Sequence, residues 1–340
     1  SGDGYTVRCN EREADVRYAY DYPAFTSDPI DGSVPAGAVS RLTAVYEGNN
    51  TNLLFYDLHG RVVANRITLN LPGEPPTQGT MRWTYDAAGN VTSLTYPDGE
   101  RVRYRYDPAG QVYGVIGDRL YARRISYDLF GRPRELALGN GLRDIREYRD
   151  FAGNFRLASA RTERPGRVLQ QLDYASYSAN GLLEVLREPN APDVADLDRN
   201  TSFTYDGLGR LRTARFQRTT TVLDYQYDPI GNIVQKEGTT LFYARQRPHQ
   251  AVAIDGFDQI VQYDDNGNRT RKGNTAYEYD AENRLVRVDG GAVEFAYDQA
   301  GNRLGRRLAG GRWVRTYFGL AEASDGFLTK YYFAGKILIA

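Results

Sequence analysis

Cysteine and histidine, the residues that most often build disulfides, metal sites and catalytic triads, are scarce in this sequence of 340 residues. Cys9 is the only cysteine, so an internal disulfide is excluded and we expect a structural or incidental thiol. His59 and His249 are the only histidines. They are poor material for a zinc site or a His-based triad.

Charge of one sign and long apolar runs are missing as well. Lys and Arg number 43, and Asp and Glu also number 43, so the chain lacks the basic field that nucleic acid binding requires. The apolar runs are too short to cross a bilayer, and no secretory signal is recognisable. The chain begins without Met and ends at Ala340 inside an apolar run. We therefore interpret it as a piece of a longer polypeptide.

Tyrosine and glycine are abundant instead, with 27 and 35 residues. A Tyr-Asp-x-x-Gly pattern recurs along the chain, and three consecutive intervals between Tyr85 and Tyr148 are each 21 residues long. The gap between Tyr227 and Tyr263 predicts a further, degenerate copy near Tyr243. Two other long intervals contain the insertions LPGEPPTQG and EPNAPDVADLDRN. Eleven copies are recognisable, with tyrosines at positions 56, 85, 106, 127, 148, 177, 205, 227, 263, 279 and 297.

The residue types of this pattern have a direct backbone meaning. In a type I turn, Asp favours the first position because its side chain accepts hydrogen bonds from turn N–H groups, and Pro favours the second. Pro108 and Pro229 occupy that second position. A type I turn followed by a left-handed Gly is a common hairpin connection, so the motif predicts a hairpin with Tyr at the end of the incoming strand. The predicted structural turn residues are Tyr56, Asp57, Gly60, Tyr85, Asp86, Gly89, Tyr106, Asp107, Gly110, Tyr127, Asp128, Gly131, Tyr205, Asp206, Gly209, Tyr227, Asp228, Gly231, Tyr263, Asp264, Gly267, Tyr297, Asp298 and Gly301.

Short alternating segments fill the intervals between the turns. In RVRYRY, the apolar and aromatic side chains Val102, Tyr104 and Tyr106 share one face and the arginines share the other, which indicates a strand. One hairpin is marginal alone, and right-handed twist accumulates over many strands. We therefore predict an all-β fold, a long antiparallel meander of YD-repeat hairpins coiled into a spiral strip or a partial hollow β-shell. Residues 1–340 form a single YD-repeat domain in this prediction, and the place of residues 1–50 is left open.

The repeated YDxxG[NR] at this spacing resembles the YD repeats of the RHS family, from about Tyr56 to the end of the chain. The segments YEYDAENRLVRV, FAYDQAGNRLGRR and KYYFAGKILIA are similar to the approach to the end of an RHS core. The family includes bacterial polymorphic toxins, the cocoon-forming component of Tc toxins and the extracellular part of teneurins. The resemblance implies a β-strip that spirals into a hollow shell. In the bacterial toxins that shell holds a C-terminal toxin polypeptide, and in teneurins it serves adhesion, so a secreted or cell-surface location is implied.

The chain departs from the family at the self-cleavage motif. In the family's toxins, aspartyl self-cleavage occurs at a DPxGL motif that follows the core. The nearest match here begins at Asp228-Pro229, but Asn232 stands in place of Leu and the site lies within an ordinary repeat. We therefore expect no self-cleavage.

Other chemistry finds little support in the residue pattern. Asp264, Asn266 and Asn268 alternate like calcium ligands, but Arg269 stands where the calcium loop requires Gly. No local signature marks a carboxylate pair for glycoside hydrolysis, a nucleophile elbow or a phosphate-binding loop. The expectation is a protein that is not an enzyme and has no catalytic residue, metal or cofactor.

The predicted function is a structural shell that encloses or displays another polypeptide, such as a C-terminal toxin. Its partners would be a protein cargo or neighbouring segments of the same polypeptide. The alternative is an extracellular adhesin or appendage subunit that binds cell-surface glycans or a protein, since exposed Tyr rows can stack on sugars. Inter-strand ladders of Tyr and Arg are the favoured interpretation of those rows. Neither hypothesis involves nucleic acid or a membrane span.

Overall fold

The computed structural model describes residues 6–7, 16–21, 38–189, 200–217, 221–255 and 259–340. Cys9 and most of the EPNAPDVADLDRN insertion lie outside these described residues. Across them the chain is built from β-strands joined by turns, and it contains no helix of the length and apolar character that a membrane span needs. The chain divides into two compact units, unit 1 (Ser1–Tyr121 and Glu278–Ala340) and unit 2 (Ala122–Tyr277).

Strands that follow one another in the sequence pair with each other, and the pairing is antiparallel. It joins thirty strands, and the last two form a separate hairpin. The predicted all-β antiparallel meander is thereby confirmed. The chain passes between the units within β10 (Leu120–Tyr127) and β24 (Thr275–Tyr279). The single domain predicted for residues 1–340 stays a prediction.

The strands of unit 1 are β1 (Thr6–Val7), β2 (Val16–Tyr20), β3 (Leu42–Glu47), β4 (Asn50–Tyr56), β5 (Val62–Leu69), β6 (Thr77–Tyr85), β7 (Val91–Thr95), β8 (Arg101–Tyr106), β9 (Val112–Ile116), β25 (Leu285–Val288), β26 (Val293–Tyr297), β27 (Arg303–Leu308), β28 (Val314–Tyr317), β29 (Ala321–Ser324), β30 (Phe327–Lys330), β31 (Phe333–Ala334) and β32 (Ile337–Leu338). Those of unit 2 are β11 (Pro133–Leu138), β12 (Arg143–Tyr148), β13 (Leu157–Arg164), β14 (Arg167–Tyr177), β15 (Leu183–Arg187), β16 (Thr201–Tyr205), β17 (Leu211–Phe216), β18 (Val222–Tyr227), β19 (Ile233–Lys236), β20 (Thr239–Tyr243), β21 (Ala251–Ile254), β22 (Gln259–Tyr263) and β23 (Arg269–Lys272).

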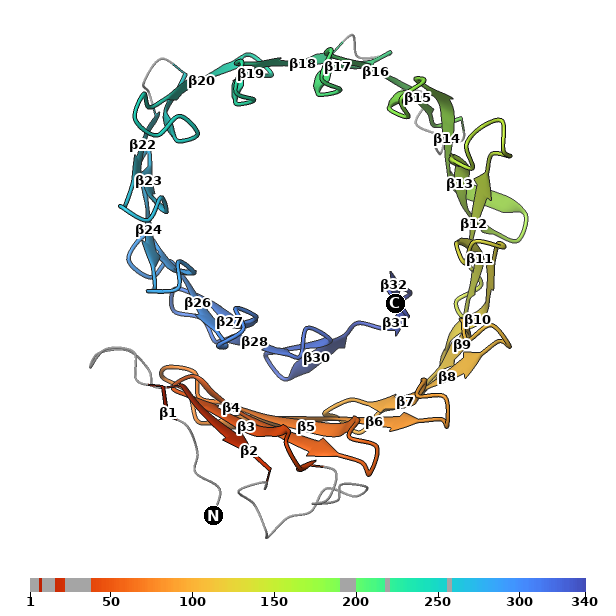
Figure 1. Ribbon diagram of the computed structural model, residues 1–340, viewed down its shortest axis with the longest axis vertical. Helices are drawn as coiled ribbons and strands as arrows, with labels where there is room; N and C mark the ends of the chain where they lie inside the picture. Colours follow the sequence, from red (N-terminus) through yellow and green to blue (C-terminus); the bar gives the residue numbers. More distant parts are fainter. Residues whose placement is uncertain (1–5, 8–15, 22–37, 190–199, 218–220, 256–258) are drawn as a thin grey trace. The chain divides into compact units, whose positions relative to one another are not determined.

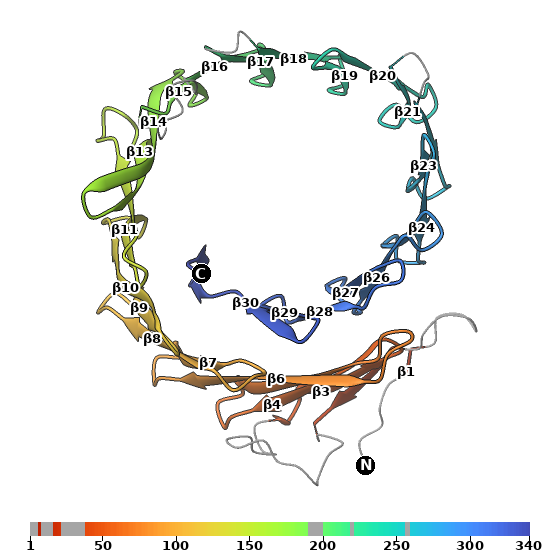
Figure 2. The same cartoon turned by 180° about the vertical axis from the view of Figure 1, so that it is seen from behind.

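Unit 2 is a single layer of sheet. Its strands β11–β23 follow one another in sequence order along one curved strip (Figures 1 and 2). Within the described residues of unit 2, no second layer covers the strip, and most side chains of both faces keep some contact with solvent. Among the described residues of unit 2, the buried apolar side chains are Ala122, Ile125, Leu136, Ala214, Ala253 and Val261.

Unit 1 holds the main core, because strands from the two ends of the chain pack against each other there. The buried cluster of Ala44, Leu53, Phe55 and Ala64 lies on β3–β5. Farther along, β31 lies beside β9, and Figure 1 shows β28 and β30 next to the strands of the first segment. The largest fully buried apolar side chains among the described residues all belong to this unit: Tyr96, Leu69, Met81, Val45, Val102 and Val115.

Ten of the eleven repeat tyrosines adjoin an irregularity in the pairing register of their hairpin. In the hairpin of β6 and β7, Thr84 pairs with Ser93 but Tyr85 pairs with Val91, which leaves one extra residue. The same slip adjoins Tyr106 and Tyr205, among others. Because a bulge bends its strand and increases the local twist, a slip that recurs in nearly all repeats favours a curved strip over a flat sheet.

Two further expectations can be compared with these elements. The alternation of RVRYRY is confirmed, because Val102 of β8 is buried whereas Arg101, Arg103 and Arg105 are exposed. The sequence leaves the place of residues 1–50 undecided. Part of this region belongs to the sheet, since β2 pairs with β3 and β3 pairs with β4.

The packing of β6 against the C-terminal strands generates a test at Gly79. A Cβ atom there would lie 2.7 Å from the ring of Tyr317, which is itself buried. We expect Gly79→Ala to lower the free energy of unfolding by about 1–3 kcal/mol, as overpacking does. Urea denaturation measures this change. The matched control is Gly207→Ala, where a Cβ meets nothing within 4 Å, and it should be neutral or slightly stabilising. Equal effects of the two substitutions would contradict the packing described.

Candidate functional site

The predicted repeat turns bring the recurring Asp and Gly of the pattern into a local hydrogen-bonded structure. In the turn after β6, Asp86 Oδ1 accepts a hydrogen bond from the backbone N–H of Asn90 at 2.8 Å, and Asp86 Oδ2 accepts one from the Asn90 side chain at 2.9 Å. Gly89 has a φ of +87°, a conformation that glycine adopts without steric cost. The side-chain and then the backbone hydrogen bond from Asn90 lower the pKa of Asp86.

The other predicted turns repeat this geometry. The eight glycines of the predicted set have φ values between +74° and +97°, and each preceding aspartate accepts from the N–H four residues later: Asp57, Asp86, Asp107, Asp128, Asp206, Asp228, Asp264 and Asp298. Four of these turns lie in unit 1 and four in unit 2. The predicted residues therefore lie in eight separate hairpin ends and do not gather in one cleft.

In at least nine of the eleven repeats the tyrosine hydroxyl binds a backbone carbonyl of the preceding repeat. Tyr85 donates its phenolic hydrogen to the carbonyl of Val62 at 2.7 Å, and Val62 begins the strand that follows the previous turn. The degenerate copy predicted near Tyr243 makes the same bond, to the carbonyl of Ile233 at 2.8 Å. Corresponding bonds are made by Tyr56, Tyr106, Tyr148, Tyr177, Tyr205, Tyr227, Tyr263 and Tyr297.

The arginine that follows many of the turn glycines links its repeat to the next one. The Arg61 guanidinium binds Asp57 within its own turn at 2.7 Å and donates to the carbonyl of Asp86 in the next turn at 2.9 Å. It also lies over the ring of Tyr85, 4.7 Å from the centroid. Arg132 makes the same kind of stacking contact with Tyr148, as do Arg210 with Tyr227 and Arg284 with Tyr297. The motif contained this arginine, but its partner becomes visible only when neighbouring hairpins are paired.

The two turns that raised other chemistry are ordinary members of this set. Asp264 of the calcium-like segment accepts hydrogen bonds from the backbone and side chain of Asn268 at 2.8 and 2.9 Å. Asp228 of the DPxG segment is held in the same way by Asn232. The Asn232 side chain in addition donates to the carbonyl of Pro248 at 2.7 Å. Both carboxylates therefore have turn N–H and amide groups as partners.

The LPGEPPTQG insertion receives the C-terminal strands of unit 1. Trp313, which is only 2% exposed, donates its indole N–H to the carbonyl of Pro72 at 3.0 Å and its backbone N–H to Glu74 at 3.2 Å. Arg315 forms an ion pair with Glu74, and Arg307 donates to Pro72 at 3.1 Å. The insertion, which the repeat pattern shows only as an interruption, thus makes a specific contact between distant parts of the chain.

A second contact of the same unit is formed by Glu100, Tyr121, Lys330 and Tyr332, which we name the carboxylate cluster. Glu100 is 5% exposed and accepts hydrogen bonds from the hydroxyls of Tyr121 at 2.6 Å and Tyr332 at 2.7 Å. Lys330 forms an ion pair with the same carboxylate. The rings of Tyr121 and Tyr332 stack with their centroids 3.9 Å apart. Because a buried charge is costly unless it is paired and hydrogen-bonded, this arrangement selects one docked position for the segment that carries Tyr332.

The electrostatics of the cluster agree with that role. Burial alone would raise the pKa of Glu100, but hydrogen bonds from Lys330, Tyr121 and Tyr332 outweigh it and lower the pKa to about 2. Burial, with the neighbouring Tyr121 and Glu100, raises the pKa of Tyr332. Glu100 is therefore ionised, and the tyrosine is a neutral donor, over the physiological pH range. The cluster holds no base poised to titrate near neutral pH, which is the usual requirement for general acid–base catalysis.

Sequence reasoning did not find the carboxylate cluster. Glu100 follows a Gly-containing turn in the segment PDGE, and Tyr332 lies in KYYF, but nothing local relates the two. They are 232 positions apart in the sequence. A weak signal was the glutamate itself, since it directly precedes β8 and stands two positions before the buried Val102.

Tyr-Asp hairpins laid side by side and tied by hydroxyl-to-carbonyl bonds define a YD-repeat β-strip protein. The comparisons with known families agree with this class. The RHS Repeat model matches residues 85–117, and the Teneurin YD-shell model matches residues 193–324. Over these residues the comparisons confirm the resemblance to YD-repeat proteins of the RHS family.

Solved structures and curated relatives extend the comparison. The Tc holotoxin pore structure of Photorhabdus luminescens matches 93% of this chain and 18% of its own, with 17% identity and a TM-score of 0.68. A crystal structure of TcdB2-TccC3-TEV matches 96% of this chain and 19% of its own, with 17% identity and a TM-score of 0.70. These matches show the shared fold.

The sequence relatives are longer proteins. The tRNA3(Ser)-specific nuclease WapA of Bacillus spizizenii is 33% identical over 109 residues, which is 29% of this chain and 4% of that protein. The tRNA nuclease WapA of Bacillus subtilis is 32% identical over 111 residues, with the same two shares. The chain thus spans about a fifth of the solved chains and a few per cent of the WapA proteins.

The bond between repeats can be tested with Tyr85→Phe, which removes the hydroxyl that binds Val62 and keeps the ring. We expect a loss of about 1 kcal/mol in the free energy of unfolding, because the Val62 carbonyl loses its side-chain donor. Urea denaturation is the measurement. The control is Tyr113→Phe on β9, an exposed tyrosine outside the repeat turns, which should change little. A Tyr85 variant as stable as the control would show that the hydroxyl does not couple the repeats.

The carboxylate cluster predicts a specific pH dependence. The folded-state pKa of Glu100 lies at about 2, below its usual value of 4.5, so its stabilisation is complete above pH 4.5 and is lost as the pH falls towards 2. The free energy of unfolding of Glu100→Gln should be lower than that of the parent at neutral pH by about 1–3 kcal/mol. It should also fall less steeply between pH 4.5 and 2. Glu278→Gln, at an exposed acid of β24, is the control and should keep the parent's slope. Identical slopes for the parent and Glu100→Gln would refute the assignment.

Proposed function

We propose that this chain is a wall segment of an RHS-type shell that encloses or displays another polypeptide, and that this segment acts without catalysis. The observation that carries the proposal is the single-layer strip of unit 2. A compact binding domain buries one face of its sheet against a second layer. In unit 2 both faces keep contact with solvent, and the buried apolar residues among the described ones are few, half of them alanines. Such a strip is suited to separate two aqueous compartments.

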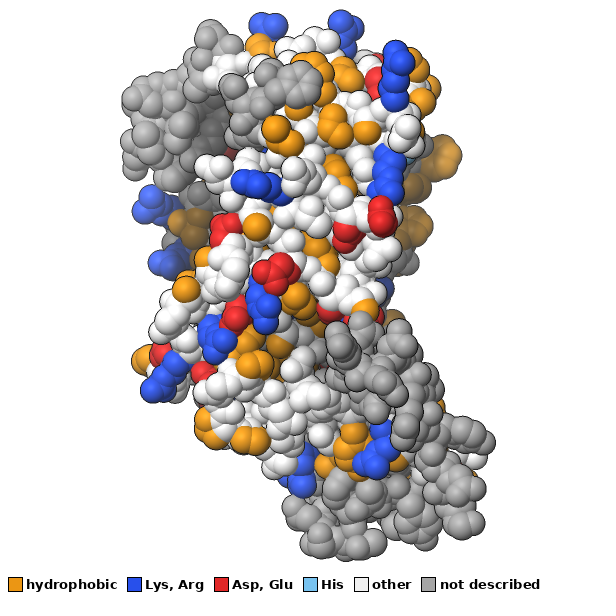
Figure 3. Space-filling view, turned by 90° about the vertical axis from the view of Figure 1, so that its left-hand side faces the viewer, with side chains coloured by type: hydrophobic (Ala, Val, Ile, Leu, Met, Phe, Trp, Pro, Cys, Tyr) orange, Lys and Arg blue, Asp and Glu red, His pale blue; other side chains and the backbone are white. Residues whose placement is uncertain are grey.

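The surface chemistry supports the same role. On the face seen in Figure 3, basic and acidic side chains are interspersed among small apolar groups. The backbone groups of interior strands are paired with their neighbours, so they do not offer free edges to a passing chain. The most exposed large apolar side chains of unit 2, Leu129, Phe130, Phe151 and Leu208, are residues of the hairpin turns, so the paired strands of the wall would give an unfolded cargo no open sheet edge to bind. Isolation of the cargo, and not its recognition, is therefore the proposed task.

The relatives support the partner and the location in this proposal. The Tc holotoxin and TcdB2-TccC3 structures share the fold, and the WapA proteins are named as nucleases although they match this chain over only 4% of their length. By analogy, the partner proposed here is a protein cargo or another segment of the same polypeptide. The proposed location is secreted or at the cell surface.

Small-angle X-ray scattering of the 340-residue chain tests the wall. A compact globule of this length has a radius of gyration of about 20 Å. A curved single-layer wall places its mass farther from the centre, so we expect a clearly larger value together with a broad distance distribution. A value near that of the globule, with a single symmetric maximum, would overturn the proposal.

Enclosure is tested separately with a disordered reporter polypeptide fused after Ala340. We expect a nonspecific protease to cleave this reporter more slowly than the free reporter at the same concentration. The matched control carries the same fusion on Glu100→Gln, in which docking of the segment around Tyr332 is weakened. If the chain shows the expected scattering but the fused reporter is cleaved at the rate of the free reporter, enclosure is contradicted. The curved wall would then be the only part of the proposal that is supported.

A further inference from the structure

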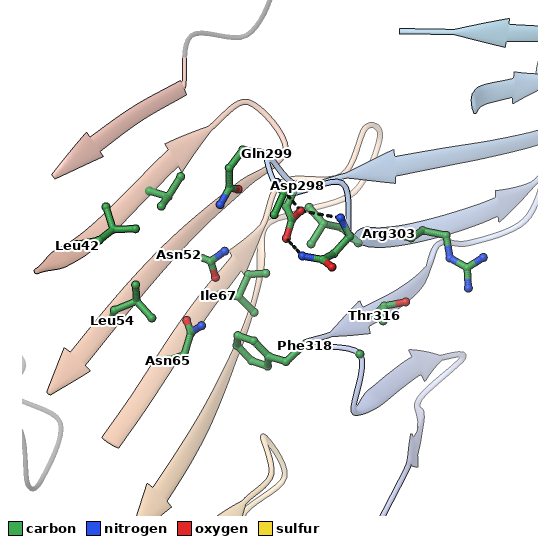
Figure 4. A pocket seen from close by; sticks show the side chains of 15 residues that line it. Leu42, Asn52, Leu54, Asn65, Ile67, Asp298, Gln299, Arg303, Thr316 and Phe318 are labelled. Atoms are coloured by element: carbon green, nitrogen blue, oxygen red, sulfur yellow. Dashed lines mark hydrogen bonds between the residues drawn. The ribbon is translucent and has the colours of Figure 1, made fainter. Parts of the chain in front are cut away.

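A pocket of about 520 Å³ lies within unit 1, where β3–β5 face the turn after β26 and the strands β27 and β28 (Figure 4). Its volume is in the range of small-molecule sites. The first wall is a patch of four side chains on two neighbouring strands. Asn52 pairs with Ile67, and Leu54 pairs with Asn65. Side chains two residues apart share a face, so the two amides and the two apolar side chains alternate diagonally across this patch.

Three buried acceptor atoms of this pocket have no hydrogen-bond partner among the residues that the structure describes. They are Oδ1 of Asn52, Oδ1 of Asn65 and Oε1 of Gln299, the last from the facing turn. Figure 4 shows all three side chains around the same space. Buried polar atoms are nearly always paired, and each unpaired one carries a desolvation cost. A ligand with several hydrogen-bond donors would remove that cost at three points.

The facing wall presents an aromatic ring on an unusual backbone. Phe318 and Gly319 have φ values of +55° and +67°, and the N–H of Leu320 donates to the carbonyl of Tyr317 at 3.0 Å. This is the geometry of a type I′ hairpin turn, which favours Asn or Asp at its first central position. The corresponding residue is Asp325 in the next hairpin, where Gly326 follows it. A bulky aromatic residue in this conformation is strained, and such strain is a feature of functional sites.

Charge restricts the kind of ligand. The carboxylate of Asp298 already accepts hydrogen bonds from the backbone and side chain of Asn302, at 2.8 and 2.9 Å. Arg303 lies 3.8 Å from Glu322, so its charge has a partner. The remaining lining consists of amides, Thr316 and apolar side chains. A strongly acidic ligand would meet unpaired acceptors, and a cation would find no unengaged carboxylate among the described lining residues.

The geometry points to a saccharide site in this pocket: a neutral, hydroxyl-rich ring would donate hydrogen bonds to Asn52, Asn65 and Gln299 and would place its apolar face against Phe318. The ligand class follows from the combination of uncharged acceptors and an aromatic surface. This inference is independent of cargo enclosure, because it concerns only unit 1. It also differs from stacking on exposed Tyr rows, since the acceptors are buried.

Isothermal titration calorimetry of the 340-residue chain with a panel of neutral mono- and disaccharides tests the site. We expect at least one member to bind. Asn65→Leu and Asn52→Leu should each weaken that binding by about tenfold, because each removes one acceptor. Asn266→Leu is the matched control: it lies in an exposed turn position where other repeats carry Leu208 or Ile230, and its affinity should equal that of the parent.

Phe318→Asn separates binding from folding. Asn is a preferred residue for this turn, so the variant should be at least as resistant to urea as the parent while its saccharide affinity falls. Asp325→Asn in the neighbouring hairpin should leave the affinity unchanged. The inference is overturned if no saccharide of the panel binds, if Asn65→Leu and Phe318→Asn retain full affinity, or if glucosamine, glucuronate or triglycine binds in place of the neutral sugars.

Discussion

The hydrogen bond from the tyrosine hydroxyl of one repeat to a backbone carbonyl of the preceding repeat is the interaction on which this structure depends. A single hairpin is marginal in water, and unit 2 has few buried apolar side chains to compensate. Tyr85 binds Val62, and Arg61 reaches forward to the ring of Tyr85 and to the carbonyl of Asp86. Each repeat is therefore held from both sides by polar contacts. The stability of such an array is the sum of the stability of each repeat and of the contacts between neighbouring repeats. A single layer of sheet provides both contributions without a second sheet.

Unit 1 follows a different principle. Its strands from the two ends of the chain pack against each other, and the contacts are individual and not repeated. Trp313 fits against Pro72, and Tyr332 meets Glu100 through a buried charge. Buried ion clusters add little net stability compared with apolar packing, but they penalise every arrangement that leaves a charge unpaired. We infer that the repeats supply most of the cohesion and that the carboxylate cluster supplies the specificity of docking.

The parts that the sequence predicts well are those in which cause and effect lie within a few residues. Asp86, Gly89 and the alternation around Val102 are local, so turn chemistry and a period of two were sufficient to predict hairpins, strands and the meander. The contact of Glu100 with Tyr332 depends on a packing of distant segments that no local pattern encodes. The same holds for Phe318, whose conformation is unusual only once the turn type is known. The insertion LPGEPPTQG was recognisable as a departure from the period, but its partner was not.

Specific chemistry in this chain lies where the repeat is broken. Within the repeats, the aspartates of the turns and most of the tyrosine hydroxyls already have backbone partners, so these groups are not available to bind a ligand. The exceptions arise outside the motif: the insertion around Glu74, Glu100 after an ordinary turn, and Phe318 where Asn or Asp is favoured. A residue that is unfavourable for its local structure is expected to have a compensating role elsewhere in the molecule. For Glu74 and Glu100 that is the docking of the C-terminal strands, and for Phe318 the pocket beside Asn65 is the remaining feature that the ring can serve.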